Sequence, residues 1–205
     1  MSLRKFGNQY PVVDFPLYNE EQVKNTNKKL AENIIAEQNP SASSKISKKS
    51  GKFYHVPVSS VMETTMPFIS SIEACNREYF GYDLYISYQN DFYTYNIYEE
   101  GDEYEWHTDA YSSPKSDVKL TCLINLSEDS FEGGEFEVAG YNLTKYDFSK
   151  PGTVVIFNPI AAHRVTPVTK GKRITLSYWA TGPSWRWMKL NLGCGHDYLF
   201  EWINV

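Results

Sequence analysis

The stretch YEEGDEYEWHTD, residues 98–109, places an imidazole and a carboxylate two positions apart, in His107 and Asp109. Alternate residues of a β-strand point to the same face of a sheet, so both side chains could reach a single ion. The run before them, residues 91–98, is aromatic and β-branched and predicts a strand. An acidic turn containing a glycine follows, and the chain then returns to extended structure over residues 104–109.

A third candidate ligand, His163, follows a turn at Pro151 and Gly152 and an apolar strand predicted over residues 153–157. A histidine just past a buried strand is well placed to point into a cavity. Two imidazoles and one carboxylate hold Fe(II) in non-haem oxygenases and leave adjacent positions open for a cosubstrate and O₂. Because a single histidine is more often a surface or hydrogen-bonded core residue, the combined spacing carries this prediction.

Ten residues after His163, Arg173 begins a predicted strand that runs to Trp179. Residues 163–168 are predicted to form the other half of a hairpin-like pair with it. Alternation puts Arg173 and Thr175 on one face of the strand. A guanidinium beside a hydroxyl is a good receptor for a carboxylate, because it donates two charge-assisted hydrogen bonds. The alternative is a structural salt bridge between Arg173 and an acidic side chain.

In combination, these motifs resemble the 2-oxoglutarate/Fe(II)-dependent dioxygenase superfamily, and within it the prolyl 4-hydroxylase-like group. The resemblance covers residues 88–179. The opening stretch is similar to that group's Tyr-x-x-Gly-x-x-Tyr-x-x-His-x-Asp signature, and residues 120–127 and 133–136 resemble its next core strand and its Gly-Gly turn. Residues 163–168 together with Arg173 resemble the bacterial PKHD-type hydroxylases.

The resemblance implies a mainly β (α+β) fold, a double-stranded β-helix or jelly roll with N-terminal helices packed on one sheet. It implies that His107, Asp109 and His163 hold Fe(II), with no catalytic side chain beyond these metal ligands. The implied cosubstrate is 2-oxoglutarate, and ascorbate is an optional addition. The residues implied to bind 2-oxoglutarate are Arg173, Tyr98, Thr175 and Asn125.

The implied activity is hydroxylation of a substrate C–H bond, with a prolyl residue of a protein or peptide as the favoured substrate. A free amino acid or another small molecule is an alternative within the same superfamily. Nucleic-acid demethylation of the AlkB type is a second alternative, but Thr175 and Trp179 stand where that group has Asn and Arg. A non-catalytic cupin- or lectin-like jelly roll that binds a metal or sugar is a third, and it would not need Arg173.

The length predicts one domain of ordinary size with ample material for a core. The net charge of −5 and the sequence pI of about 5.4 predict no general attraction to nucleic acid or to an anionic membrane. Three widely spaced cysteines favour a reducing compartment over a disulfide framework. A cytoplasmic location is expected, since no apolar run has the length of a membrane span and no signal-peptide core is evident. The sequence does not predict the oligomeric state.

We expect a single domain over residues 1–205. Within it, residues 1–82 form an N-terminal helical support and loop, residues 83–180 form the jelly-roll core, and residues 181–205 form a C-terminal aromatic segment. That last segment is expected to pack on the outer face of the sheet rather than to form a lip of the substrate site. Its aromatic residues include Trp185, Trp187, Tyr198, Phe200 and Trp202.

The first predicted helix begins after Asn19, which can cap it, with Gln22 at the capping-box position. An apolar stripe carries this helix to Ile35, and it ends before residue 39. The polar, basic residues 39–51 that follow predict a solvated loop, and a lid over the active site is the minority alternative.

A second helix is predicted over residues 67–80, with Pro67 at its start and Gly81 at its end. From there to Trp179 the chain is rich in short strands. Helices followed by closely spaced strands predict an antiparallel β core with the helices packed on one sheet.

Overall fold

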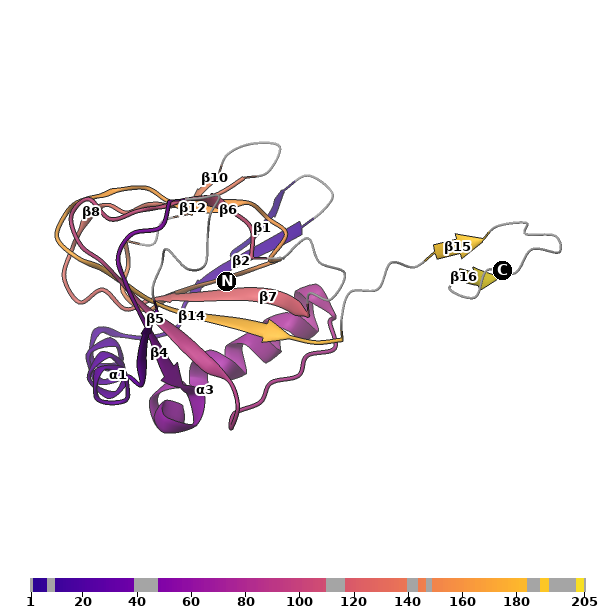
Figure 1. Ribbon diagram of the computed structural model, residues 1–205, viewed down its shortest axis with the longest axis horizontal. Coiled ribbons are helices and arrows are strands. Elements are labelled where there is room, and N and C mark those ends of the chain that lie inside the picture. Colours follow the sequence, from indigo (N-terminus) through magenta and orange to yellow (C-terminus); the bar gives the residue numbers. More distant parts are fainter. Residues whose placement is uncertain are drawn as a thin grey trace.

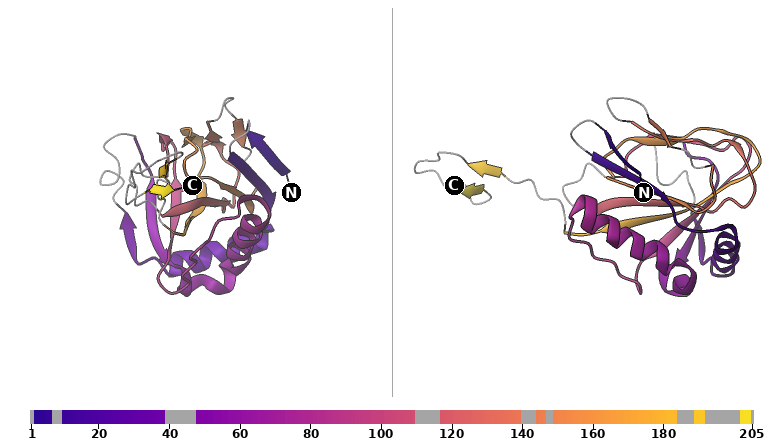
Figure 2. Two further views of the ribbon diagram at one scale, coloured as in Figure 1. Left: turned by 90° about the vertical axis from the view of Figure 1, so that its right-hand side faces the viewer. Right: turned by 180° about the vertical axis from the view of Figure 1, so that it is seen from behind.

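The structure is a computed structural model of the chain. It describes all residues except 1, 7–9, 39–47, 110–116, 140–143, 147–148, 184–188, 192–201 and 205. A larger and a smaller antiparallel sheet lie face to face, and two helices cover the outer face of the larger sheet (Figure 1). The view from behind shows the same order of layers (Figure 2).

The larger sheet has eight strands in the order β1-β2-β11-β7-β14-β5-β4-β3. Four of these strands come from the first 82 residues, so the segment expected to give helical support also supplies half of this sheet. In sheet order, the strands are Ser2–Phe6, Tyr10–Pro16, Thr153–Phe157, Val118–Asn125, Arg173–Thr181, Phe92–Tyr98, Lys52–Pro57 and Ala36–Gln38.

The smaller sheet has the order β10-β9-β12-β6, formed by Thr144–Tyr146, Phe136–Val138, His163–Val165 and Tyr104–His107. Beside it, β8 (Glu132–Gly133) pairs with β13 (Val168–Lys170). Near the C-terminus, β15 (Lys189–Asn191) pairs with β16 (Trp202–Asn204) in parallel. The predicted packing of the C-terminal aromatic residues concerns side chains that lie outside the described part of the chain.

Helix α1 spans Glu20–Glu32, and Asn19 caps it through the predicted capping box with Gln22. The predicted continuation of this helix through Ile34 and Ile35 is wrong. Ile35 is 60% exposed, and its N–H donates to the carbonyl of His55, which leads the chain into β3. The backbone N–H and C=O groups that were expected to bond within the helix therefore bond between β3 and β4 instead.

Helix α3 spans Val58–Cys75 and continues as a π-helix, η1, over Asn76–Phe80. Its end at Gly81, which has a φ of 71°, matches the prediction, but its start lies nine residues before Pro67. The buried stripe of α3 is continuous through this region, and Pro67 is on the exposed side. Packing of that stripe therefore outweighs the local preference of proline for a helix start. Among the described helices, none is long and apolar enough to cross a membrane.

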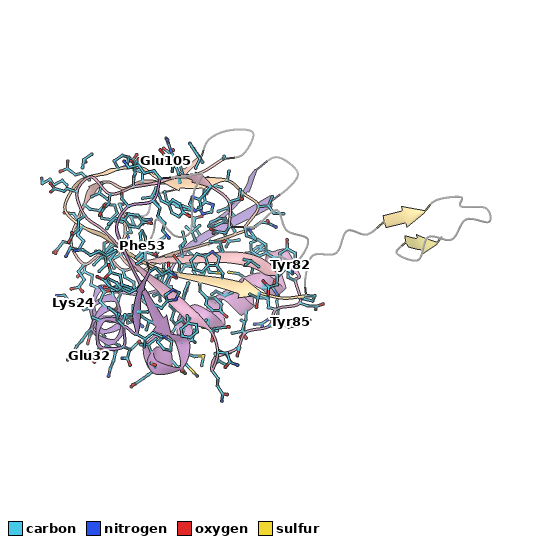
Figure 3. All side chains as sticks on the ribbon, in the orientation of Figure 1. Lys24, Glu32, Phe53, Tyr82, Tyr85 and Glu105 are labelled. Atoms are coloured by element: carbon cyan, nitrogen blue, oxygen red, sulfur yellow. The ribbon has the colours of Figure 1, made fainter. Side chains whose placement is uncertain are left out.

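Two hydrophobic cores flank the larger sheet. One lies between this sheet and the helices, where the rings of Phe68 and Tyr93 pack 6.4 Å apart. The other lies between the two sheets and includes Phe53, whereas Glu105 points outward from the smaller sheet (Figure 3). Alternation divides β7 between them, with Cys122 toward the helices and Leu123 toward the smaller sheet.

The hairpin-like pair predicted for residues 163–168 and 170–179 does not form. Strand β12 pairs with β6 and β9 in the smaller sheet, whereas β14 pairs with β5 and β7 in the larger one. His163 and Arg173 therefore belong to different layers. They nevertheless line the same cavity between the sheets, because each faces the opposite layer.

Candidate metal centre

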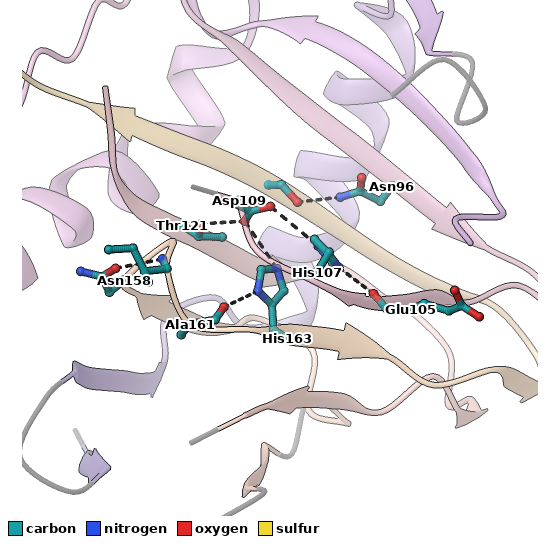
Figure 4. A network of polar contacts seen from close by, with 10 residues as sticks. Asn96, Glu105, His107, Asp109, Thr121, Asn158, Ala161 and His163 are labelled. Atoms are coloured by element: carbon teal, nitrogen blue, oxygen red, sulfur yellow. Dashed lines mark hydrogen bonds and ion pairs between the residues drawn. The ribbon is translucent and has the colours of Figure 1, made fainter. Parts of the chain in front are cut away.

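The side chains of His107, Asp109 and His163 meet between the sheets, with one ligand atom of each within 4.8 Å of the others. The carboxylate of Asp109 faces both imidazoles, whose ring centres lie 4.1 Å apart (Figure 4). Its Oδ1 is 3.7 Å from Nε2 of His107, and its Oδ2 is 3.4 Å from Nε2 of His163. The structure thus brings together all three residues that the sequence nominated as metal ligands.

The pairing of β6 with β12 aims the two imidazoles at one another. His107 lies directly opposite His163, and Tyr104 lies opposite Val165. Three residue steps on β6 therefore match two on β12, which is a β-bulge. Because of this bulge, Tyr104 and His107 both turn inward, and their rings stack at 3.4 Å between centroids.

Backbone carbonyls orient both imidazoles. Nδ1 of His107 donates to the carbonyl of Glu105 at 2.8 Å, and Nδ1 of His163 donates to the carbonyl of Ala161 at 2.9 Å. A proton on Nδ1 leaves the lone pair on Nε2, the atom that faces Asp109. Burial, reinforced by the neighbouring His163, lowers the pKa of His107 to about 4. The imidazole of His107 is therefore neutral, as a metal ligand must be, throughout the neutral pH range.

Asp109 is fixed at both its backbone and its side chain. Asp109 lies just past the end of β6, and its backbone N–H donates a hydrogen bond to the carbonyl of Pro159 at 3.0 Å. The hydroxyl of Thr121, on β7 of the larger sheet, donates to Oδ2 of Asp109 at 2.7 Å. A hydrogen bond of this kind fixes the orientation of a ligating carboxylate.

The donor set fits a divalent first-row metal such as iron. Two neutral imidazole nitrogens and one carboxylate oxygen are the mixed ligands that Fe(II) takes in non-haem oxygenases. Each imidazole has the second hydrogen bond that metal-binding histidines have in proteins. These three residues and their supporting contacts are consistent with a bound iron.

The three residues line a cavity of about 70 Å³ between the sheets. The lining residues are Lys49, Asn96, Tyr98, Tyr104, His107, Asp109, Leu123, Phe136, His163, Val165, Arg173, Thr175, Ser177 and Trp179.

Arg173 supplies a buried positive charge to this cavity. The side chain is 1% exposed, and its guanidinium lies 5.2 Å from the centre of the Tyr98 ring. Burial lowers the pKa of Arg173 to about 10, so the group stays charged at neutral pH. Gly134 makes room for it, because a Cβ at that position would come within 3.0 Å of the arginine Cδ. A buried cation that faces a cavity favours an anionic ligand there.

Three further residues were nominated for the cosubstrate, and two of them lie at the cavity. Tyr98 pairs with Arg173 in register, and Thr175 follows on the same face of β14, as alternation predicted. Asn125 is not among the described residues that line the cavity. It is buried, and its Oδ1 accepts a hydrogen bond from the N–H of Ser127 at 2.8 Å.

Sequence reasoning missed several polar residues of the site. Asn96 lies two residues before Tyr98 on β5, and its side-chain amide donates a hydrogen bond to the hydroxyl of Ser177 at 2.8 Å. Alternation from Tyr98 and Arg173 could have found both residues. Thr121 and Lys49 had no such signal, because long-range pairing brings them to the site.

Comparison with known proteins shows which family part of the chain is similar to. Residues 93–181 match the sequence model of the 2OG-Fe(II) oxygenase superfamily, a segment that includes the three candidate ligands and Arg173. The resemblance inferred from the motifs is therefore confirmed over this segment, which is similar in sequence to the 2OG-Fe(II) oxygenase superfamily.

Curated proteins with a similar sequence include PKHD-type hydroxylases. One from Xylella fastidiosa (strain 9a5c) is 31% identical over 98 residues, which are 42% of this chain and 42% of that protein. One from Alteromonas mediterranea is 33% identical over 94 residues, covering 42% of this chain and 41% of that protein. The matched region thus spans less than half the length of these curated relatives.

Solved structures confirm the predicted jelly-roll fold. A prolyl-4-hydroxylase from Pseudomonas putida has a TM-score of 0.64 at 13% identity, covering 83% of this chain and 92% of that chain. A Trichoplax adhaerens prolyl hydroxylase, in complex with a hypoxia inducible factor peptide fragment, has a TM-score of 0.63 at 16% identity, covering 85% and 84%.

Proposed function

We propose that this chain is an Fe(II)- and 2-oxoglutarate-dependent dioxygenase that hydroxylates a substrate C–H bond. One observation carries the proposal: three metal-ligand side chains and the buried cation of Arg173 face a single cavity. In the overall reaction, substrate, O₂ and 2-oxoglutarate give hydroxylated substrate, succinate and CO₂. A metal-binding jelly roll without activity would not need the buried arginine.

In this proposal His107, Asp109 and His163 hold the iron, and Arg173 holds the distal carboxylate of 2-oxoglutarate. Tyr98 and Thr175 assist from the same wall of the cavity. The iron and 2-oxoglutarate, when bound, supply O₂ activation and hydroxylation of the C–H bond. The protein binds and orients these groups. Ascorbate as an addition, and the assignment of residues 1–205 to one domain, stay predictions.

The proposed substrate is a prolyl residue of a protein or peptide. Support comes from the names of the relatives and structural neighbours, and from the peptide bound to the Trichoplax adhaerens protein. Hydroxylation of a free amino acid or another small molecule is the second candidate.

Succinate release tests the proposed function. The protein would be supplied with Fe(II) and 2-oxoglutarate and screened against proline-containing peptides, lysate proteins and free amino acids. We expect succinate in proportion to hydroxylated product, and none with the His163→Ala variant. A metal-loaded wild-type protein that neither binds 2-oxoglutarate nor converts it, with or without these substrates, would show that the site is not an oxygenase.

A further inference from the structure

Lys49 brings a second positive charge to the cavity from a direction that the sequence did not suggest. The chain just before β4 runs beside β6: the N–H of Glu105 donates to the carbonyl of Lys48, and the N–H of Ser50 donates to the carbonyl of Glu103, each at 2.9 Å. Lys49 itself forms a bridge with Tyr104. This pairing attaches Lys49 to the strand that carries His107.

The side chain of Lys49 lies within the cavity, next to two aromatic rings. Its Nζ is 3.9 Å from the centre of the Phe53 ring and 4.9 Å from the centre of the Tyr104 ring. Tyr104 in turn stacks on His107. The ammonium and a candidate metal ligand thus both contact the Tyr104 ring, and contacts with the Phe53 and Tyr104 rings hold the ammonium there.

The neighbouring lysines are different. Lys48 bonds Glu103 and Lys52 bonds Glu99, and both side chains are more than half exposed. Within the described part of the chain, no carboxylate forms an ion pair with Lys49. The acidic group that acts on it is Asp109, which already faces two imidazoles and the hydroxyl of Thr121. Burial lowers the pKa of Lys49 to about 8, so most of the population is charged at neutral pH.

Lys49 and Arg173 reach the cavity from different layers. Arg173 projects from the larger sheet and is 1% exposed, whereas Lys49 comes from the segment beside the smaller sheet and is only partly buried. Two cations on separate walls can hold two anions at once. If the buried Arg173 holds the cosubstrate, the more exposed Lys49 is left to bind the primary substrate.

We propose that Lys49 binds a carboxylate of the primary substrate. The inference rests on the proposed function, and it narrows the substrate class to molecules with a carboxylate close to the hydroxylated carbon. That carboxylate belongs to a free amino acid, to the C-terminus of a peptide, or to an acidic side chain beside the target residue. A neutral internal segment of a protein would leave the ammonium desolvated without a counter-charge.

Binding of matched probes tests this without turnover. The protein would be loaded with Zn(II) and 2-oxoglutarate, and binding measured by saturation-transfer NMR and by calorimetry. The probes are the free amino acids, their N-acetyl derivatives, the N-acetyl amides, and N-acetyl amides of Asp and Glu. The variants are Lys49→Met, which keeps the chain length between the two rings, Lys49→Arg, which keeps the charge, and Lys48→Met as the control.

We expect at least one carboxylate probe to bind wild type more tightly than its amide. Lys49→Met should weaken the binding of that probe by about thirtyfold and leave the binding of its amide unchanged. Lys49→Arg should retain part of the preference for the carboxylate over the amide. Lys48→Met should resemble wild type. The identity of the best probe decides which source supplies the carboxylate.

Two results would overturn the inference. In the first, no carboxylate probe binds wild type more tightly than its amide. In the second, Lys49→Met weakens the binding of 2-oxoglutarate itself, which would make Lys49 part of the cosubstrate site. Failure of the proposed function gives a different result, because then wild type would not bind 2-oxoglutarate at all. Circular dichroism of each variant verifies that it is folded.

Discussion

The hydroxyl of Thr121 donates a 2.7 Å hydrogen bond to the carboxylate of Asp109, and the two residues belong to different structural layers. Thr121 lies in β7 of the larger sheet, whereas Asp109 follows β6 of the smaller sheet. The bonded oxygen, Oδ2, is the one that faces Nε2 of His163. The larger sheet therefore sets the direction of a candidate ligand that the smaller sheet supplies.

The variant Thr121→Val should weaken metal binding by about 10- to 100-fold, because the carboxylate loses the bond that orients it. Anaerobic Fe(II) titration measures this effect. Thr65→Val is the matched control, since its buried hydroxyl bonds the carbonyl of Val61 in the helix-side core. An equal loss of metal affinity in both variants would mean that the effect comes from general destabilisation.

Replacing any one of His107, Asp109 or His163 by alanine should abolish tight Fe(II) binding, because the described cluster offers no spare ligand. Metal should raise the melting temperature of wild type but not of these variants. Asp109→Glu should also lose activity, since the longer side chain moves the carboxylate by roughly 1 Å. Undiminished stoichiometric binding in His163→Ala would remove that residue from the centre.

Arg173→Ala should cost about 2–5 kcal/mol in 2-oxoglutarate binding, because a desolvated anion would lose its charged partner. Fe(II) affinity should stay close to that of wild type. Arg173→Lys should restore part of the binding, since lysine keeps the charge but not the two parallel hydrogen bonds. The measurement is calorimetric titration of 2-oxoglutarate into Zn(II)-loaded protein, and an unchanged Kd in Arg173→Ala would reject the assignment.

Gly152→Ala should lower the free energy of unfolding by about 2–4 kcal/mol. Gly152 has a φ of 77°, and a Cβ there would collide with the backbone carbonyl of Tyr18. Gly81 has a similar φ of 71°, but a Cβ there would meet no atom within 4 Å. Gly81→Ala should therefore cost only the backbone strain, about 1–2 kcal/mol. Urea unfolding of the two variants separates collision from strain.

The parts of the site that the sequence predicted are those with short-range patterns. His107 and Asp109 are two residues apart, and Arg173 and Thr175 lie on one strand, so alternation was enough to group each pair. Lys49 could not be found in this way. It reaches the cavity because its backbone pairs with β6, more than fifty residues further along the chain.

The errors in the predicted helices have the same origin. Capping of α1 by Asn19 depends on neighbouring residues and was predicted correctly. Its end at Glu32 depends on the pairing of β3 with β4, and the start of α3 at Val58 depends on the core beneath it. Contacts between distant segments decide these boundaries, and local preferences do not report them.

The bulge in β6 means that the spacing between Tyr104 and His107 is one residue longer than a regular strand needs. Glu105 and Trp106 occupy this spacing with exposed side chains, and Glu105 accepts a hydrogen bond from the N–H of Lys48 while Trp106 packs against Arg164. Deleting one of these two residues would leave two steps on β6 opposite two on β12, so Tyr104 and His107 would still share the inner face of a strand without a bulge. Shortening this strand by one residue should therefore spare the direction of a candidate iron ligand.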